Sequence, residues 1–194
     1  MSDISIRDRI QYRKQHAVDP EIFLESAGAI EPTDTDEQLQ FTSTFRTEMD
    51  RYVEQYEAEG VGSTEIARIF GVPEENAQPV DRPYTAFKVI HTIHKWPSEG
   101  ALVLDAAADA ALRDRTEEWE EVPPRQRYRI LQALRSFQDA CLFCGDEIRF
   151  SETPVESCCG EVQVITLHCD GCERRFLEFQ TEEGIDAPFS LRDK

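Results

Sequence analysis

The amino-acid sequence predicts a mainly α protein. A helical domain over residues 1–138 is followed by a small three-stranded antiparallel sheet over residues 139–182 and a loosely ordered tail over residues 183–194. Before residue 138, apolar residues recur every three or four positions, as in amphipathic helices. After residue 141 the pattern changes to alternation, which is typical of strands. A chain of 194 residues with 40% hydrophobic residues has room for one ordinary domain and a small second one.

The first helices of the predicted domain are marked by their ends. Two short helices are expected over residues 3–28, because Asp19-Pro20 places an N-cap residue before a proline at the first helical position, and Gly28 is a typical stop. Thr35-x-x-Gln38 matches a capping box. The helix that follows ends at Gly60 and carries an apolar stripe made of Phe45, Met49, Tyr52, Val53 and Tyr56.

Three further helices are predicted between residues 63 and 97. Ser63 begins a short helix that ends at Phe70-Gly71, and Pro73 opens another short one. Pro83 opens a third, which Trp96-Pro97 closes. Its apolar residues are Tyr84, Phe87, Ile90 and Ile93. His91 and His94 lie on that helix, where packing at the edge of the core is the simplest interpretation.

Two helices complete the predicted domain. An alanine-rich helix follows Gly100 and extends to about Trp119, and we expect its two carboxylates, Asp105 and Asp109, to lie on a solvated face. Pro123-Pro124 end this segment. The last helix carries Tyr128, Leu131, Leu134 and Phe137 on one side.

Three extended segments follow Cys141, over residues 147–150, 162–168 and 175–179. Three short strands are only marginally stable on their own. The cysteines supply a way to hold them together. All six lie between residues 141 and 172, and four of them form two C-x-x-C pairs: Cys141 with Cys144, and Cys169 with Cys172.

Two C-x-x-C turns can direct four thiolates at one point, which is the tetrahedral sulfur shell that Zn²⁺ favours. Gly145 suits the tight left-handed turn after the first pair. We therefore expect Cys141, Cys144, Cys169 and Cys172 to bind one structural zinc ion. A disulfide framework would need an oxidising compartment, a redox C-x-x-C pair would sit on a βα unit, and an iron–sulfur cluster would use the same thiolates.

The adjacent pair Cys158-Cys159 lies outside the two C-x-x-C pairs. Neighbouring cysteines rarely supply two ligands to one ion, so the simplest interpretation is a pair of small buried residues at a turn. An exchange with one of the four ligands, or a separate redox-sensitive site, stays open. His168, next to Cys169, could replace a ligand, although strand alternation places it more simply beside the site or at the surface.

The order of C-x-x-C pair, two strands, second pair and third strand over residues 139–182 resembles a zinc ribbon. Zinc ribbons often serve transcription, translation and RNA machinery. The resemblance therefore implies a protein associated with nucleic acid or with a protein of that machinery.

A second, shorter segment resembles a helix-turn-helix. Over residues 63–80, an aliphatic residue and a small alanine precede an apolar-Gly-apolar turn and a further short helix. The residues at these positions are Ile66, Ala67, Phe70, Gly71, Val72, Ala77 and Val80. The second helix departs from the family pattern because it begins Pro73-Glu74-Glu75 and meets Pro79 after about two turns.

The net charge is −18, with 39 acidic residues against 17 Arg and only 4 Lys. Acids that are dispersed along a chain poor in lysine are typical of proteins from a salt-rich cytoplasm, where screening is short-ranged. Under that interpretation the overall charge does not exclude nucleic acid, and local charge decides. We expect neither a membrane span nor a secretory signal, and therefore a cytoplasmic protein.

The strongest local positive charge lies on the last predicted helix and after the second C-x-x-C pair. We expect Arg125, Arg129, Arg174 and Arg175 to contact nucleic acid. Alternatively, the arginines of the helix pair with the acidic stretch over residues 117–121. No catalytic motif is present, so we predict a zinc-binding, non-enzymatic protein that acts on nucleic acid, as a transcriptional regulator of a halophilic organism. A zinc-ribbon adaptor for protein partners is the alternative.

Overall fold

The computed structural model describes residues 16–33, 39–157 and 160–181. The first predicted helix, the Thr35–Gln38 capping box, the Cys158-Cys159 pair and the tail lie outside these residues. The helices are α2 (Pro20–Ser26), α3 (Ser43–Glu59), α4 (Ser63–Phe70), η1 (Glu74–Asn76), α5 (Glu99–Arg115), α6 (Glu118–Glu121) and α7 (Pro124–Leu134). The strands are β1 (Ile30–Pro32), β2 (Leu39–Phe41), β3 (Ala77–Pro79), β4 (Ala86–Val89), β5 (Thr92–Lys95), β6 (Ile148–Ser157), β7 (Gly160–Cys169) and β8 (Arg175–Thr181).

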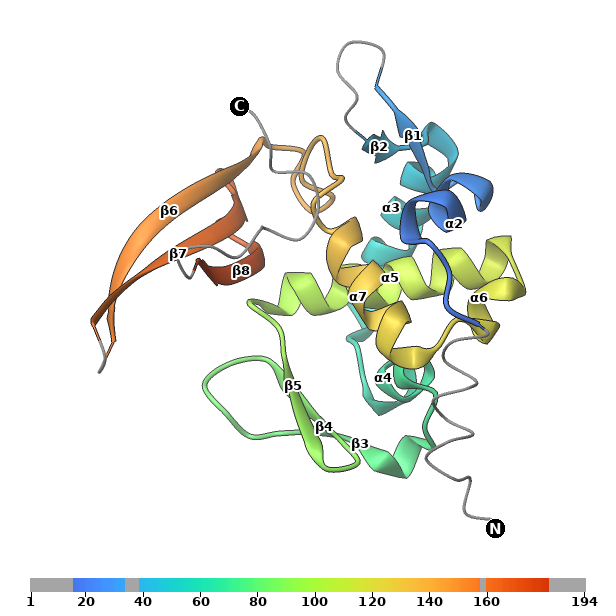
Figure 1. Ribbon diagram of the computed structural model, residues 1–194, viewed down its shortest axis with the longest axis horizontal. Coiled ribbons are helices and arrows are strands. Elements are labelled where there is room, and N and C mark those ends of the chain that lie inside the picture. Colours follow the sequence, from blue (N-terminus) through green and yellow to red (C-terminus); the bar gives the residue numbers. More distant parts are fainter. Residues whose placement is uncertain (1–15, 34–38, 158–159, 182–194) are drawn as a thin grey trace.

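The predicted all-α class of the first domain is wrong. Three small antiparallel sheets are present, and two of them, β1-β2 and β3-β4-β5, lie among the helices. The third, β6-β7-β8, projects from one side of the helical part (Figure 1). Its strands contain the three extended segments expected from the alternating pattern.

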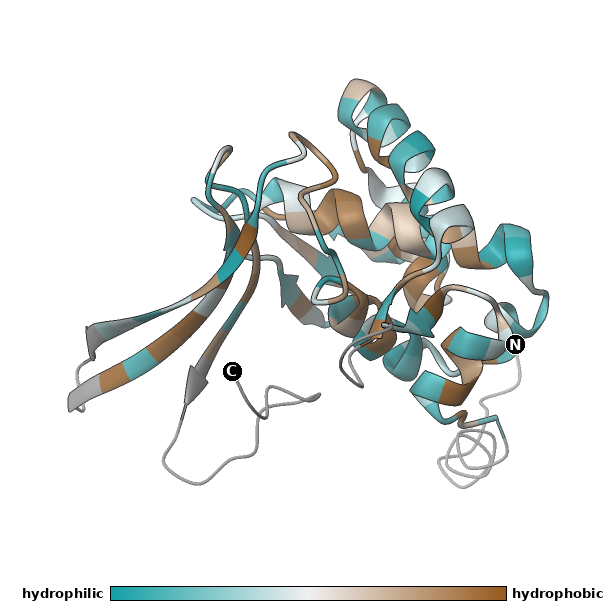
Figure 2. Ribbon diagram, turned by 90° about the horizontal axis from the view of Figure 1, so that it is seen from above, coloured by the Kyte–Doolittle hydropathy of each residue, from teal (hydrophilic) through white to brown (hydrophobic). Residues whose placement is uncertain are grey.

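Helix α5 is the centre of the molecule, and α3, α4 and α7 pack around it (Figure 1). Every residue from Gly100 to Leu112 is buried. Alanines on all sides let neighbouring helices approach closely, so this helix has no solvated face. Figure 2 shows apolar colouring on this central helix and hydrophilic colouring on the peripheral α3. The helix ends at Arg115, and the predicted continuation to Trp119 is the separate short helix α6.

The two carboxylates of α5 are fully buried, so the expected solvated face is wrong. Asp109 accepts hydrogen bonds from Arg68, Arg113 and the indole of Trp119. Asp105 accepts from the Trp96 indole at 2.8 Å and from the Arg135 guanidinium at 2.7 and 2.5 Å. These partners compensate the carboxylates for their lost hydration. The same contacts bind α5 to its neighbours.

The predicted helix over residues 83–97 is wrong, because this segment forms the hairpin of β4 and β5. The apolar residues suit either spacing, but Val89, Ile90, Thr92 and Ile93 are β-branched and favour strands. Phe87 and Val89 are buried while Lys88 between them is exposed, as strand alternation requires. The hairpin turns at Ile90-His91, where Ile90 has φ +57°.

The helix-turn-helix expected over residues 63–80 is also wrong. Its first helix is α4, which Gly71 ends in the left-handed conformation at φ +61°. The second helix is replaced by the single 3-10 turn η1 and by strand β3. Pro73 and Pro79 bracket too few residues for an α-helix, and Ala77 pairs with Val89 of the hairpin instead.

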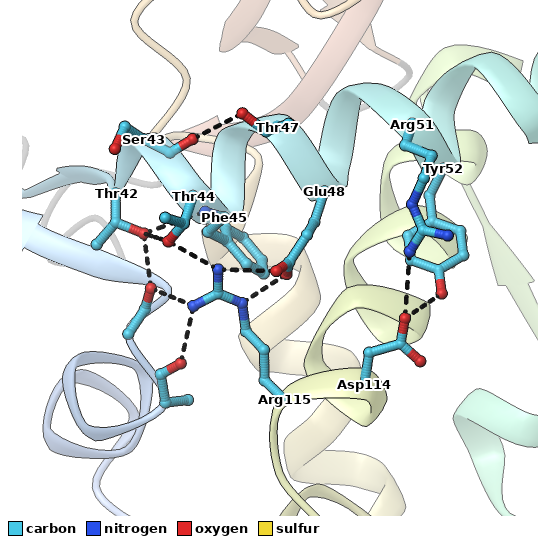
Figure 3. Close-up of polar contacts among 12 residues, drawn as sticks. Thr42, Ser43, Thr44, Phe45, Thr47, Glu48, Arg51, Tyr52, Asp114 and Arg115 are labelled. Atoms are coloured by element: carbon cyan, nitrogen blue, oxygen red, sulfur yellow. Dashed lines mark hydrogen bonds and ion pairs between the residues drawn. The ribbon is translucent and has the colours of Figure 1, made fainter.

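An arginine at the end of α5 connects the first elements to the core (Figure 3). Arg115 donates to the carbonyl oxygens of Ala27 and Gly28 at 3.1 and 2.6 Å. Its other nitrogens reach Glu48 and Thr44 on α3. A residue with five donors therefore joins α2, α3 and α5 at one point.

The β6-β7-β8 sheet is joined to the helical part at the start of β8. Phe176 is fully buried in the same apolar cluster as the helices. Its carbonyl accepts from Arg135 at 3.0 Å, and the carbonyl of Arg175 accepts from Ser98, the N-cap of α5, at 2.5 Å.

Among the described residues, no helix is both long and apolar enough to cross a lipid bilayer.

Candidate metal centre

Two turns bring the C-x-x-C cysteines together. After α7, the amide of Gly145 donates to the carbonyl of Cys141 at 2.8 Å, and Gly145 has φ +82°, which suits a residue without Cβ. Cys169 is the last residue of β7, and Glu173 closes the second turn by donating to the Cys169 carbonyl at 3.0 Å. Glu173 has φ +57°, so the left-handed position is filled here by a residue other than glycine.

The four sulfur atoms of Cys141, Cys144, Cys169 and Cys172 all lie within 4.8 Å of one another. The Cys141–Cys172 and Cys144–Cys169 sulfur pairs are 3.7 and 3.3 Å apart, and all four cysteines are free of disulfides. A tetrahedral ion with bonds of about 2.3 Å to sulfur separates its ligands by about 3.8 Å. The cluster therefore has the dimensions of a four-thiolate shell around a single ion.

The cysteines differ in their surroundings. Cys141 and Cys169 are buried, Cys172 is half-buried and Cys144 is exposed. Burial raises the pKa of Cys141 to about 12. Burial also opposes ionisation of Cys169, but the backbone amide of Cys172 and the Cys144 thiol outweigh it and lower the pKa of Cys169 to about 7. Cys169 therefore ionises much more readily than Cys141, and thiols that are still protonated lose their protons when a cation binds.

The second turn approaches the first most closely at Gly171. A Cβ added to Gly171 would lie 1.7 Å from a carboxylate oxygen of Asp146, on the first turn. The two turns therefore meet tightly beside the cysteines. On their other side, Phe143 stacks on Phe176 with ring centroids 6.0 Å apart, which seats the cluster on the buried core.

The other candidates near the cluster do not join it. His168 is half-buried, with its Nδ1 3.4 Å from the Ser151 hydroxyl and its Nε2 3.5 Å from Asp170. Within the described part of the chain, the four cysteines form the one group of metal-ligating side chains, and His168 is not a member. Cys158 and Cys159 lie outside that part.

The four arginines expected to contact nucleic acid fall into two groups. Arg174 donates to Glu57 at 2.7 Å and lies over the Phe143 ring, 4.2 Å from its centroid, so it fastens the sheet to α3. Arg175 pairs with Glu178 of the same strand at 3.1 Å. Arg125 and Arg129 are exposed on α7 and have no hydrogen bond or ion pair with any residue that the structure describes. The alternative pairing with residues 117–121 is therefore not found for these two.

The histidines of the hairpin lie apart from the cluster. His94 is half-buried between the rings of Phe70 and Tyr128, at centroid distances of 4.2 and 5.3 Å, and His91 is exposed in the turn. Sequence reasoning missed the exposed lysines beside them, Lys88 and Lys95, because it treated this segment as a helix. The available signal was that residues 82–98 contain no acidic residue.

Comparisons with known proteins assign the chain to a family but not to a function. Residues 19–136 match the central domain of a family of unknown function (DUF8054), and residues 139–179 match the C-terminal domain of the same family. No curated protein and no solved structure matches the chain. Because the central-domain match covers more than half of the sequence, the chain belongs to the DUF8054 family.

Proposed function

We propose that this protein is a zinc-stabilised, non-enzymatic protein that binds nucleic acid. The observation that carries the zinc assignment is the cluster of four cysteine sulfurs within 4.8 Å. Tetrahedral sites with sulfur ligands alone select zinc or iron. A four-iron cluster attaches each cysteine to a different iron, and a two-iron cluster attaches two cysteines to each iron, so both spread the four sulfurs, whereas the 3.3 and 3.7 Å separations suit a single ion.

The proposed role of the ion is structural. Four protein thiolates complete a tetrahedral shell, so no coordination position is left for water or substrate. The ion would hold the turn after α7 to the turn between β7 and β8. Since Phe143 on the first turn and Phe176 at the start of β8 pack together and into the helical core, the ion also stabilises the contact between the sheet and α5.

Nucleic acid is the proposed partner because cations are exposed and uncommitted on α7. Arg125 and Arg129 are one helical turn apart and pair with none of the described residues, so their guanidinium groups are available to phosphate. Arg174 and Arg175 contribute less, because each is already paired with a carboxylate. The zinc-ribbon resemblance points in the same direction.

A protein-interaction adaptor is the second candidate, and one feature of the β6-β7-β8 sheet favours it. Phe150 is 44% exposed on β6. It pairs with Leu167, which pairs with Leu177. Ile165 and Phe179 continue this apolar face toward the far end of the sheet, where both are only partly buried. Such a face suits an apolar partner better than a phosphate backbone.

Binding across a salt series separates these two functions. The full-length, zinc-loaded protein is titrated into a labelled single-stranded oligonucleotide of about 20 nucleotides, with salt varied from about 50 to 200 mM. Nucleic-acid binding predicts saturable affinity whose logarithm falls linearly with the logarithm of salt concentration. An affinity that does not change with salt, or no binding in a preparation shown to be folded and metal-loaded, contradicts the nucleic-acid function and favours the adaptor.

A further inference from the structure

The hairpin of β4 and β5 is a positively charged segment of an acidic protein. Residues 82–98 contain Arg82, Lys88 and Lys95 and no carboxylate, on a chain whose net charge is −18. The chain has four lysines, of which Lys88 and Lys95 lie in the described part. All three cations are exposed. Arg82 and Lys88 form no ion pair with any residue described by the structure, and Lys95 lies over the ring of Tyr84.

Strand pairing places Lys88 and Lys95 on one outer face of the sheet. Lys88 lies opposite Ile93, and Gln78 of β3 lies on the other side of Lys88. Lys95 is two residues after Ile93 and therefore shares its face. The intervening residues Phe87 and His94 point the other way, where they pack on buried rings.

The hairpin segment is also unusually apolar for a solvated surface. Five large hydrophobic side chains are strongly exposed in the described part of the chain, and three of them belong to this segment: Tyr84 at 44%, Ile90 at 48% and Ile93 at 45%. The Lys95 ammonium lies 5.5 Å from the centroid of the Tyr84 ring. A cation beside an exposed aromatic ring is the combination that contacts a phosphate and its base together.

The hairpin turn holds one of these residues in a strained conformation. Ile90 has φ +57°, which a β-branched residue rarely adopts. Its amide nevertheless donates to the Asn76 carbonyl at 2.8 Å, so the turn is fixed rather than free. A strained backbone that presents an exposed isoleucine is more typical of a binding surface than of a connecting turn.

The element behind the sheet lacks carboxylates as well. Residues 122–138, which include α7, contain four arginines and no acid. Tyr128 of α7 packs on the inner face of the hairpin, with ring centroids 5.3 Å from His94 and 5.8 Å from Trp96. Two acid-free segments that are far apart in sequence therefore lie together. Exposed carboxylates bound this region at Glu74 and Glu75, next to β3, and at Asp81 and Glu99, which directly flank the acid-free segment.

We propose that the surface made of Lys88, Ile93 and Lys95 on this outer face, together with Arg82 and Tyr84 in the loop before β4, binds single-stranded nucleic acid. The proposal rests on the nucleic-acid function proposed above and adds a surface to the Arg125 and Arg129 pair on α7. A single strand is thin and flexible, so it can follow the hairpin and avoid Glu74 and Glu75. A rigid duplex or an anionic membrane would extend over those carboxylates and be repelled. Unstacked bases also find apolar contacts at Tyr84 and Ile93.

The test compares matched variants of the full chain by fluorescence anisotropy, with labelled oligo(U) and oligo(dT) of about 20 nucleotides as probes. Lys88→Gln/Lys95→Gln removes two phosphate contacts, so the slope of log affinity against log salt should fall by about 1.4, which is about a 25-fold weaker affinity at 0.1 M salt. Tyr84→Ala should weaken binding about fivefold or more without changing the slope. Arg51→Gln, which removes an exposed cation on α3, is the control and should leave both unchanged.

The outcomes of this test distinguish the nucleic-acid function, the proposed surface and the type of partner. Wild-type protein that is folded but binds neither probe overturns the nucleic-acid function and this surface with it. Wild-type binding that survives the double lysine substitution, or that Arg51→Gln abolishes, overturns only the surface. Tighter binding to the matching duplex or to phosphatidylglycerol vesicles rejects single strands as the partner. Because Lys88 and Lys95 are exposed, circular dichroism and zinc content should match wild type, and Arg82→Gln supplies a second variant outside the strands.

Discussion

Replacing Asp105 by asparagine tests whether the buried ion pair on α5 organises the junction of the two parts. The Asp105 and Arg135 side chains are 0% and 2% exposed. Burial opposes the charge of Arg135, but Asp105 outweighs it and raises the pKa of Arg135 above its usual value. The substitution keeps the shape of residue 105 but leaves that guanidinium without its counter-charge.

Breaking one side of a buried pair costs about 3–5 kcal/mol, against a total stability of about 5–15 kcal/mol for a typical domain. At about 2–4 °C per kcal/mol for a chain of this size, the melting temperature should fall by about 6–20 °C. Arg135 also donates to the Phe176 carbonyl, so the start of β8 should loosen together with α5.

Urea unfolding, followed by circular dichroism and tryptophan fluorescence, measures this cost. Asp50→Asn is the matched control: Asp50 is 53% exposed and pairs with Arg46, so its loss should cost about 1 kcal/mol or less. The double variant Asp105→Leu/Arg135→Met removes both charges and should cost about 1–3 kcal/mol less than the sum of its single variants. A cost for Asp105→Asn as small as that of the control, or strict additivity in the double variant, would refute the reasoning.

Three further predictions follow from the hairpin and the surface charge. Ile90→Asn should raise the free energy of unfolding by about 1 kcal/mol in urea titrations, because asparagine tolerates the positive φ, and a loss would show that Ile90 is not strained. Burial lowers the pKa of the His94 imidazole in the folded protein. As the pH falls, the unfolded chain therefore binds a proton at His94 before the folded protein does. Stability should then fall as the pH drops below about 6.5, and His94→Phe should remove that component of urea midpoints measured across pH. Dialysis into dilute buffer should reduce helical circular dichroism if the dispersed carboxylates repel one another, whereas full retention of helix would contradict the halophilic interpretation.

Local signals in the sequence located several helix ends and the cysteine cluster. Asp19 caps α2 through its side chain, Gly60 follows α3, and Gly71 ends α4 in the left-handed conformation. These features depend on a few adjacent residues and on the conformations that each residue type allows. Each C-x-x-C turn likewise depends on a few adjacent residues. The order of the strands was enough to predict that the two turns lie together.

The features that sequence reasoning missed depend on tertiary contacts. The apolar residues of the hairpin recur every three positions, at Tyr84, Phe87, Ile90 and Ile93, which matches the spacing expected of a helix. The segment forms strands because it pairs with β3 and with itself. Helix α5 is buried on all sides, so it shows no apolar stripe. The burial of Asp105 could not be inferred without its partners on other elements. The division into domains at about residue 138 stays a prediction, since Phe176 and the helices share one apolar cluster.

The most direct test of the zinc centre is the metal content of the purified full-length protein, measured by native mass spectrometry together with elemental analysis. One zinc ion per chain is expected, and it should be lost from Cys141→Ser and from Cys169→Ser, whose sulfurs lie in the cluster. Cys158→Ser is the matched control and should retain one zinc. Absence of metal, iron in place of zinc, or a lowered zinc count in Cys158→Ser would contradict the four-cysteine zinc site.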